Sequence, residues 1–446
     1  MTTEFSAPRY PGPVSAAMLE ELPRYVIADP YPFVLDLPNC EGMWLATVDG
    51  QRLFDWAGYF GSKLIGHNHP RLYEQDYVTR LVCAANNKVA NPDFLTPECL
   101  DYYRLLHRIA PESMRNPLLE VYAVNSGAEA VENMMKYLVA RFNAKRRAQG
   151  KEITGKRFLY FDNAFHGRTV FALAVTQTVD PVATKDFHGL TIGGNIQIPF
   201  PAINTSEPDE WNRDKQKRSL DMIETVLEQM AHEIVGILVE PIQGAGGHRV
   251  ATKEFFQELS RLAHKHDVYL AFDEVQTSLG PTGKIFAIDH FDLPHPPMAV
   301  AVGKKFGCGA VYMYEPLEDL GVLDSTWGGA LADMVRVVQE VKIVEEEGLI
   351  AAAALKGERL AAGLRRLAEQ PSPIYNVRGM GLYQGFSLRS PEAKARLIKR
   401  AREKHDLLLL GAGRRSIRTR PSLSVTNEDI DRFLEMLEDL LGEDGA

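Results

Sequence analysis

The chain has 446 residues, of which 45% are hydrophobic and 24% are charged, a composition typical of a globular enzyme. Because this length exceeds what one hydrophobic core usually supports, we expect a large domain and a smaller one. The net charge of −9 and the lack of a basic stripe argue against nucleic acid as a partner. No run approaches the roughly 18 apolar residues of a membrane span.

The four cysteines are scattered and show neither a C-x-x-C pair nor the spacing of metal ligands. This pattern favours buried thiols in a reducing compartment over disulfides or a metal centre. The first residues contain no basic segment followed by an apolar stretch, so the sequence predicts no secretory signal. We therefore expect a cytoplasmic protein without a bound metal.

The pattern of elements divides the chain into three parts. Residues 1–60 include an alternating segment that predicts a β-hairpin turning at Asp49 and Gly50. Residues 61–330 alternate between strand and helix patterns, which implies a large α/β domain with a mostly parallel, doubly wound sheet. Residues 331–446 begin with a long helical stretch and continue as an α+β lobe. The first and third parts flank the second, so we expect them to form one discontinuous small domain.

The strand candidates of the large domain are 121–124, 158–161, 235–239, 268–272 and 298–302. Asp273 follows the fourth of these strands, and Lys304 comes shortly after the fifth. If both strands lie in one parallel sheet, both side chains emerge at its carboxyl edge, where open α/β sheets bind ligands. An amine and a carboxylate in one crevice suit pyridoxal 5'-phosphate (PLP), because the amine forms a Schiff base and the carboxylate keeps the pyridine nitrogen protonated. Lys305 is an alternative reactive amine, because strand alternation puts the two lysines on opposite faces.

The turn Asn125-Ser126-Gly127-Ala128 comes between the first strand candidate and an amphipathic helix. A helix start offers unpaired N–H groups and the positive end of the helix dipole, so a phosphate fits there. An ordinary helix N-cap explains the same residues.

Further candidate ligand-binding residues follow the other strands. Phe165 is suited to stacking on a cofactor ring and Arg168 to clamping a carboxylate, although a core phenylalanine and a surface ion pair would explain them equally. Two acids, Asp273 and Glu274, are costly at the end of a buried strand unless a cation meets them. Gln276 is placed to donate to a phenolate oxygen.

Taken together, these segments resemble the class III (fold type I) PLP-dependent aminotransferases over about residues 30–440. Within that class, segments 87–93, 303–305 and 325–329 are most similar to L-lysine 6-aminotransferases. The segments that carry the resemblance are 125–128, 165–168, 240–244, 273–277, 303–304, 325–329 and 417–421.

The resemblance implies a role for each cofactor-binding position. Lys304 would form the Schiff base with PLP and then shuttle a proton, while Asp273 would pair with the pyridinium. Phe165 would stack on the ring and Gln276 would contact its phenolate oxygen. The phosphate would be held by Ser126, Gly127 and Ala128 and by Thr326 of the partner subunit in a homodimer.

The resemblance also implies the substrates. Arg168 would receive the α-carboxylate of L-lysine, so that the ε-amine reaches the cofactor, and Arg418 would bind a carboxylate of 2-oxoglutarate or glutamate. The products would be a semialdehyde and L-glutamate. Ala245 departs from the class, which often has a glutamate there that pairs with the arginine matching Arg418. Either another acid replaces it or the amino donor differs from lysine.

Other functions fit parts of the same pattern. Another ω-aminotransferase, acting on ornithine, 4-aminobutyrate or a further diamine or amino acid, would share the chemistry. A non-catalytic PLP-fold binding protein would be expected to lack Lys304 or Asp273, and both are present. A nicotinamide-dependent oxidoreductase is disfavoured because no G-x-G-x-x-G opens a helix after the first strand.

Overall fold

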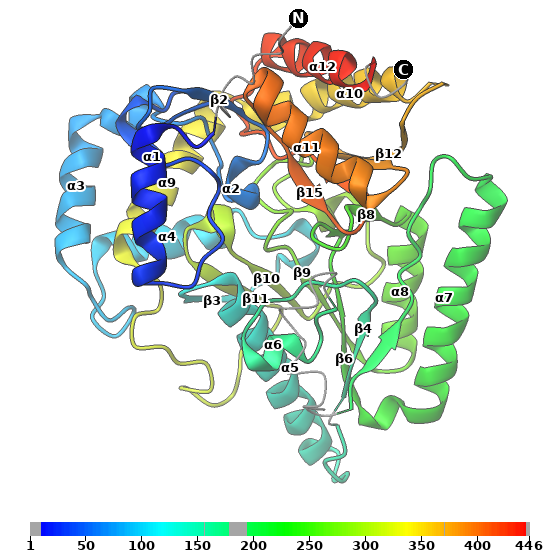
Figure 1. Ribbon diagram of the computed structural model, residues 1–446. Helices are drawn as coiled ribbons and strands as arrows, with labels where there is room; N and C mark the ends of the chain where they lie inside the picture. Colours follow the sequence, from blue (N-terminus) through cyan, green and yellow to red (C-terminus); the bar gives the residue numbers. More distant parts are fainter. Residues whose placement is uncertain (1–9, 156, 178–193, 370, 443–446) are drawn as a thin grey trace, which may run out of the picture.

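The computed structural model describes residues 10–155, 157–177, 194–369 and 371–442. A seven-stranded sheet with the order β3-β11-β10-β9-β6-β4-β5 lies at its centre (Figure 1). All neighbouring strands are parallel except β11, which runs antiparallel to both β10 and β3. The strands are β3 (Glu120–Val124), β4 (Arg157–Phe161), β5 (Ile196–Ile198), β6 (Ile234–Val239), β9 (Tyr269–Asp273), β10 (Ala299–Val302) and β11 (Gly309–Met313). The mostly parallel sheet and the five predicted strands are confirmed.

Helices cover both faces of this sheet, which explains why its central strands are almost continuously apolar. α5 (Gly127–Ala148) packs on one face, and α7 (Asp209–Met230) and α8 (Lys253–Lys265) pack on the other. The side chains of successive strand residues point to opposite faces of the sheet: Ala271 packs in the cluster that contains α5, whereas Phe272 packs in the cluster that contains α8. The sheet is therefore packed on both faces, and the loops at its carboxyl edge extend from this packed core.

The predicted N-terminal hairpin is present as β1 (Trp44–Ala46) and β2 (Arg52–Asp55). Its third strand is β14 (Leu407–Leu408), which pairs in parallel with β2. The C-terminal lobe adds a four-stranded antiparallel sheet of β12 (Ile374–Met380), β13 (Tyr383–Leu388), β16 (Ser416–Arg418) and β15 (Leu410–Ala412). The hairpin and the C-terminal lobe are thus in contact, while their union in one small domain stays a prediction.

The long helical stretch expected after residue 331 is two helices, α9 (Leu331–Glu346) and α10 (Leu349–Leu367). The break falls at Gly348, whose φ of 63° lies in the left-handed region that favours glycine. α9 packs against α3 (Gln75–Asn86) and α4 (Pro97–Arg108), whereas α10 packs against α12 (Asn427–Gly442). The exact division into domains at residues 60 and 330 stays a prediction.

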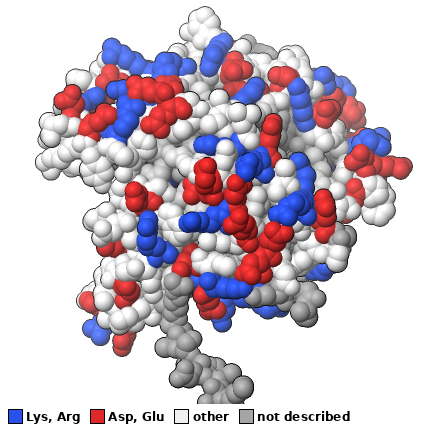
Figure 2. All heavy atoms as spheres, turned by 90° about the horizontal axis from the view of Figure 1, so that it is seen from above, with Lys and Arg blue, Asp and Glu red and all other residues white. Residues whose placement is uncertain are grey.

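The remaining elements are short or lie at the surface. They are α1 (Pro13–Glu21), α2 (Gly58–Gly61), α6 (Val170–Leu173), α11 (Pro391–His405), β7 (Ile242–Gln243) and β8 (Arg249–Val250). Figure 2 shows acidic and basic side chains interspersed over the face seen from above. Among the described helices, none is both long and apolar enough to cross a membrane.

Candidate active site

A pocket of about 210 Å³ opens at the carboxyl edge of the central sheet. It brings together residues that follow β3, β4, β6, β9 and β10, which agrees with the place where open α/β sheets bind ligands. Seven of the ten predicted site residues line it: Gly127, Ala128, Phe165, Arg168, Asp273, Gln276 and Lys304. Ser126, Thr326 and Arg418 do not line it.

Lys304 stands in this pocket because β10 ends at Val302 and the chain turns at once into a short 3-10 helix, Lys304–Phe306. Its φ of 50° is uncommon for a residue other than glycine and marks a constrained position. Burial lowers the pKa of the Lys304 amine below its ordinary value; the charge of Arg418 adds to this effect and that of Asp273 opposes it. A lowered pKa supplies the neutral amine that attack on a carbonyl carbon requires.

Lys305 has a structural task instead. Its ammonium nitrogen donates to the backbone oxygens of Gln276, at 2.7 Å, and Gly61, at 3.2 Å, and its side chain is buried. Strand alternation does not separate the two lysines as expected, because both residues lie beyond the end of β10. The pocket is nevertheless lined by Lys304 and not by Lys305.

Asp273 lies beside Ala301 in the β9–β10 register, so it emerges at the same edge as Lys304. Both of its oxygens are engaged: Oδ1 accepts from the Val275 amide at 3.0 Å, and Oδ2 is 2.8 Å from Nδ1 of His166. The Asp273 side chain is 5% exposed and that of His166 is 0% exposed. A carboxylate fixed in this way is suited to pairing with a pyridinium nitrogen.

Two further acids, Glu240 and Glu274, lie near this edge, and neither forms an ion pair with a lysine or arginine among the described residues. Glu240 lines the pocket, and its Oε1 accepts from the Phe165 amide at 2.9 Å. Burial, opposed by the charge of His166 and reinforced by that of Asp273, raises the pKa of Glu240 to about 8. Glu274 faces away: it accepts from the Thr277 hydroxyl and the Ile288 amide, and burial raises its pKa to about 7. Within the described residues, Asp273 is thus met by an imidazole and Glu274 by neutral donors, while the pyridinium expected opposite Asp273 stays a prediction.

The turn before α5 forms the other end of the pocket. Ser126 caps the helix, its hydroxyl accepting from the Glu129 amide at 3.2 Å, while Gly127 and Ala128 line the pocket. The first-turn amides of a helix have no partner within it, so an anion is the natural ligand there. The packing is close, since a methyl group on Gly303 would lie 2.9 Å from Cα of Gly127.

Arg418 lies behind Gln276. Its Nη1 donates to Oε1 of Gln276 at 3.3 Å, which leaves the Gln276 amide nitrogen available to the pocket. Arg418 is 7% exposed, and its Nε has no hydrogen-bond partner in the residues that the structure describes. Among the described residues, no carboxylate forms an ion pair with Arg418; Glu240 is the acid whose charge acts on it.

Two further predicted residues, Arg168 and Thr326, are exposed. Arg168 borders the pocket at its mouth. Thr326 lies outside the pocket, in a loop whose Ser325 accepts a hydrogen bond from Asn125 at 3.0 Å. This contact places the loop beside the start of α5.

His166 and Glu240 were missed by sequence reasoning as site residues. Each follows a parallel strand at the carboxyl edge, as Phe165 and Asp273 do, and that position is the signal that could have found them.

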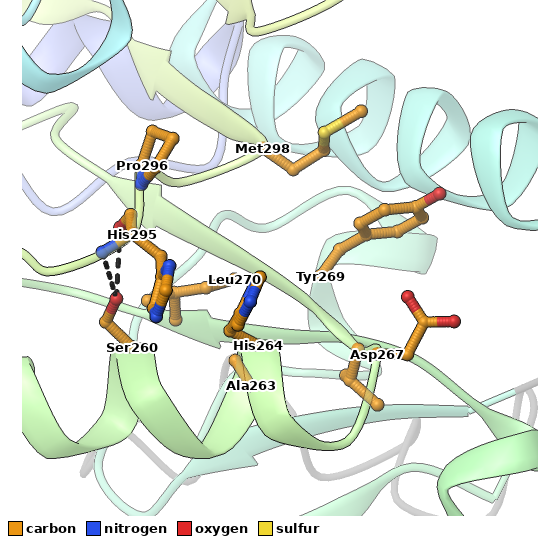
Figure 3. A pocket seen from close by; sticks show the side chains of 10 residues that line it. Ser260, Ala263, His264, Asp267, Tyr269, Leu270, His295, Pro296 and Met298 are labelled. Carbon is orange, nitrogen blue, oxygen red and sulfur yellow. Dashed lines mark hydrogen bonds between the residues drawn. The ribbon is translucent and has the colours of Figure 1, made fainter.

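A second pocket, of about 150 Å³, lies at the amino ends of β9 and β10 (Figure 3). Its imidazoles, His264 and His295, stack with ring centroids 3.7 Å apart, and Ser260 bonds the backbone of His295. It lies at the edge of the sheet opposite Lys304 and Asp273, so it is separate from the site described above.

The groups around the first pocket fit PLP. Lys304 offers an amine, Asp273 an ionic partner for the ring nitrogen, and the first turn of α5 a phosphate cradle, all around one cavity. The fold and this set of groups define a PLP-dependent enzyme of the α/β type.

Comparisons with known proteins agree with this class of enzyme. The model of the family "Aminotransferase class-III" matches residues 26–441. An L-lysine-epsilon aminotransferase of Amycolatopsis lactamdurans is 33% identical over 463 residues, covering 100% of both chains. A 4-aminobutyrate aminotransferase of Dictyostelium discoideum is 30% identical, covering 97% of this chain and 90% of that protein. A solved lysine aminotransferase from M. tuberculosis, in the internal aldimine form, superposes with a TM-score of 0.90 at 30% identity over 96% of this chain and 99% of that one.

The chain therefore belongs to the class III aminotransferases, and PLP is its cofactor.

Proposed function

We propose that this aminotransferase moves the ε-amine of L-lysine to 2-oxoglutarate, giving a semialdehyde and L-glutamate. The observation that carries the proposal is the position of two arginines relative to Lys304: Arg168 at the mouth of the pocket and Arg418 buried behind Gln276. The relative of Amycolatopsis lactamdurans, which is named for this donor and aligns over its whole length, supports the same choice.

Each residue has a defined task in this proposal. PLP, when bound, supplies an aldehyde carbon for the amine and a ring that withdraws electrons. Lys304 holds the cofactor and moves a proton at its Nζ, while Asp273 keeps the ring nitrogen protonated. Phe165 covers the ring, and the amide nitrogen of Gln276 donates to the phenolate oxygen.

The two arginines separate the two substrates. Arg168 pairs with the α-carboxylate of lysine, so the long side chain delivers its ε-amine to the reacting carbon. Arg418 pairs with the carboxylate of 2-oxoglutarate that lies nearer the cofactor. Bidentate recognition of a carboxylate is the strength of the guanidinium group.

Ala245 bears on the identity of the amino donor, because a glutamate at this position would pair with Arg418 and an alanine cannot. Burial raises the pKa of Glu240, which disfavours its charged form, and no carboxylate among the described residues forms an ion pair with Arg418. An uncancelled guanidinium favours anionic ligands. This favours, as a second candidate, an ω-aminotransferase whose donor lacks the second ammonium group of lysine, such as 4-aminobutyrate; ornithine, which carries the same charged groups as lysine, is not distinguished by this argument.

A donor comparison tests both candidates. The purified, PLP-loaded enzyme is mixed with lysine, ornithine or 4-aminobutyrate, and loss of the cofactor's visible absorption is followed in a single turnover. We expect lysine to react fastest and, with 2-oxoglutarate, to yield glutamate and the cyclic imine formed by the semialdehyde in equal amounts. Faster reaction with another donor, or no glutamate from lysine, would refute the choice of lysine. The Lys304→Ala variant is the control for amine transfer.

We also propose a cytoplasmic homodimer in which Thr326 reaches the phosphate of the partner's cofactor. The exposure of Thr326 and its position outside the pocket of its own chain support this assignment, and the four free cysteines are consistent with a reducing compartment. Mixing inactive Thr326→Ala and Lys304→Ala chains tests it, because a hybrid dimer holds one site with both native residues. Mixed chains that stay inactive although hybrids form would argue against it.

A further inference from the structure

Tyr383 is a buried residue of β13 whose hydroxyl reaches Gln276 from outside the pocket. The residue is 2% exposed, and its hydroxyl donates to the backbone oxygen of Gln276 at 2.9 Å and lies 3.4 Å from Oε1 of the same residue. Burial raises the pKa of Tyr383, so the hydroxyl keeps its proton and serves as a donor. A phenylalanine would fill nearly the same volume without a polar atom to satisfy, so the hydroxyl has a task at Gln276.

We propose that Tyr383 is a positioning residue that holds Gln276 with its side-chain amide nitrogen facing the pocket. The proposal rests on the contact between Gln276 and the phenolate oxygen of PLP, which is part of the proposed function. Gln276 lines the pocket and Tyr383 does not, so Tyr383 acts through Gln276.

Hydrogen-bond donors surround the two oxygen atoms of Gln276. Oε1 lies 3.3 Å from Nη1 of Arg418 and also faces the Tyr383 hydroxyl, while the backbone oxygen accepts from Nζ of Lys305 at 2.7 Å. A glutamine amide has an accepting oxygen on one side and a donating NH2 group on the other. A reversed amide would set its NH2 group against the Arg418 guanidinium, which cannot accept a hydrogen bond. The NH2 group is therefore the side that is turned to the pocket.

The surroundings of Tyr383 keep its hydroxyl aimed at Gln276. The guanidinium of Arg420 lies over the tyrosine ring, with Cζ 3.4 Å from the ring centroid, and a cation is attracted to the face of an aromatic ring. Nε2 of His248 lies 3.1 Å from the backbone oxygen of Tyr383. Gly61 leaves room for the hydroxyl, since a methyl group there would lie 3.0 Å from its oxygen. Ring and backbone are thus both held, and the hydroxyl has little freedom to turn away.

The test combines Tyr383→Phe with Gln276→Ala in the full-length enzyme. Tyr383→Phe keeps the ring beneath Arg420 and removes only the hydroxyl. We expect roughly 3- to 10-fold weaker PLP binding, measured by titration of the cofactor-free protein, because the net contribution of a hydrogen bond is lost. The pH midpoint of the change in the cofactor's visible absorption should move in the same direction as in Gln276→Ala. In the double variant, Tyr383→Phe should cause no further loss of PLP affinity, since the amide through which it acts is already absent.

Tyr312→Phe is the matched control, because Tyr312 is also buried and its hydroxyl bonds to the backbone oxygen of Leu106, at 3.0 Å, outside the pocket. It should lose stability while keeping the native PLP affinity and the native midpoint.

Native affinity and midpoint in Tyr383→Phe would overturn the proposal, and so would a loss of affinity that persists in full in the Gln276→Ala background. A Gln276→Ala enzyme with native affinity and midpoint would show that Gln276 does not contact the cofactor, and the proposal would fall with that contact. None of these outcomes depends on lysine as the amino donor, so this test can succeed even if that assignment fails.

Discussion

Replacing Arg418 with methionine should separate the two half-reactions. Arg418 is 7% exposed, and within the described part of the chain its side chain makes one hydrogen bond, of 3.3 Å, to Gln276. Because burying a guanidinium with so few partners costs the fold, an apolar side chain of similar length should leave thermal stability unchanged or raised. The substrate carboxylate, in contrast, loses its charged partner.

The magnitude follows from that loss. Removing one partner of a buried charge pair costs about 2–4 kcal/mol, which corresponds to roughly 30- to 1000-fold in kcat/KM. We expect this loss for 2-oxoglutarate, and little change in the rate at which lysine bleaches the PLP-loaded enzyme. Each half-reaction is measured alone by rapid-mixing absorbance.

Arg418→Lys is the matched control, since it keeps the charge but loses the planar fork, and an intermediate loss is expected. An equal loss in both half-reactions would show that Arg418 shapes the site as a whole. An unchanged 2-oxoglutarate half-reaction would show that the carboxylate binds elsewhere.

Three further predictions concern the surroundings of the cofactor. Lys305→Met removes the donor to the carbonyls of Gly61 and Gln276, so chemical denaturation should give a free energy of unfolding lower by about 1–3 kcal/mol. The Lys305→Met variant should still bind its cofactor covalently, whereas Lys304→Ala should not. Mass spectra that show the opposite would make Lys305 the Schiff-base lysine and Lys304 the structural one. Glu240→Gln addresses pH: the pKa of Glu240 rises from 4.5 to about 8 on folding, so the folded protein binds the extra proton between these values and loses stability as the pH rises. The melting temperature of the cofactor-free variant should therefore exceed that of the native protein by a margin that grows from pH 5 to pH 8, and a constant margin would contradict the assignment. Gly303→Ala pushes a methyl group to 2.9 Å from Cα of Gly127, so PLP binding measured by titration should weaken at least about tenfold, with a cost to stability of about 1–3 kcal/mol. Gly442→Ala is its control, because a methyl group there meets nothing within 4 Å.

The sequence predicted the central strands well because buried parallel strands are nearly continuous apolar runs, as in β6 and β10. It did not predict β11, since an antiparallel neighbour needs only the short turn around Lys304–Phe306 and no helical crossover. The alternation of apolar and polar residues also could not place the break at Gly348, which depends on a single left-handed residue.

The site could be predicted only in part. Asp273 and Lys304 stood out because each follows a strand of one sheet, but the choice between Lys304 and Lys305 depended on where the chain leaves β10. His166 and Glu240 are site residues because they interact with Asp273, although the three residues follow three different strands, β4, β6 and β9. Such meetings come from tertiary packing and leave no periodic pattern in the sequence.

The pairing of β2 with β14 gives the protein an unusual order of assembly. The hydroxyl of Tyr10 donates to Asp406 at 2.6 Å across a separation of 396 residues, and Phe54 pairs with Leu407. During translation the β1–β2 hairpin emerges long before its third strand, so the backbone N–H and C=O groups along one side of β2 lack this partner until residue 407 has been made. Chains stalled before residue 407 would therefore present a bare strand edge to chaperones or to each other.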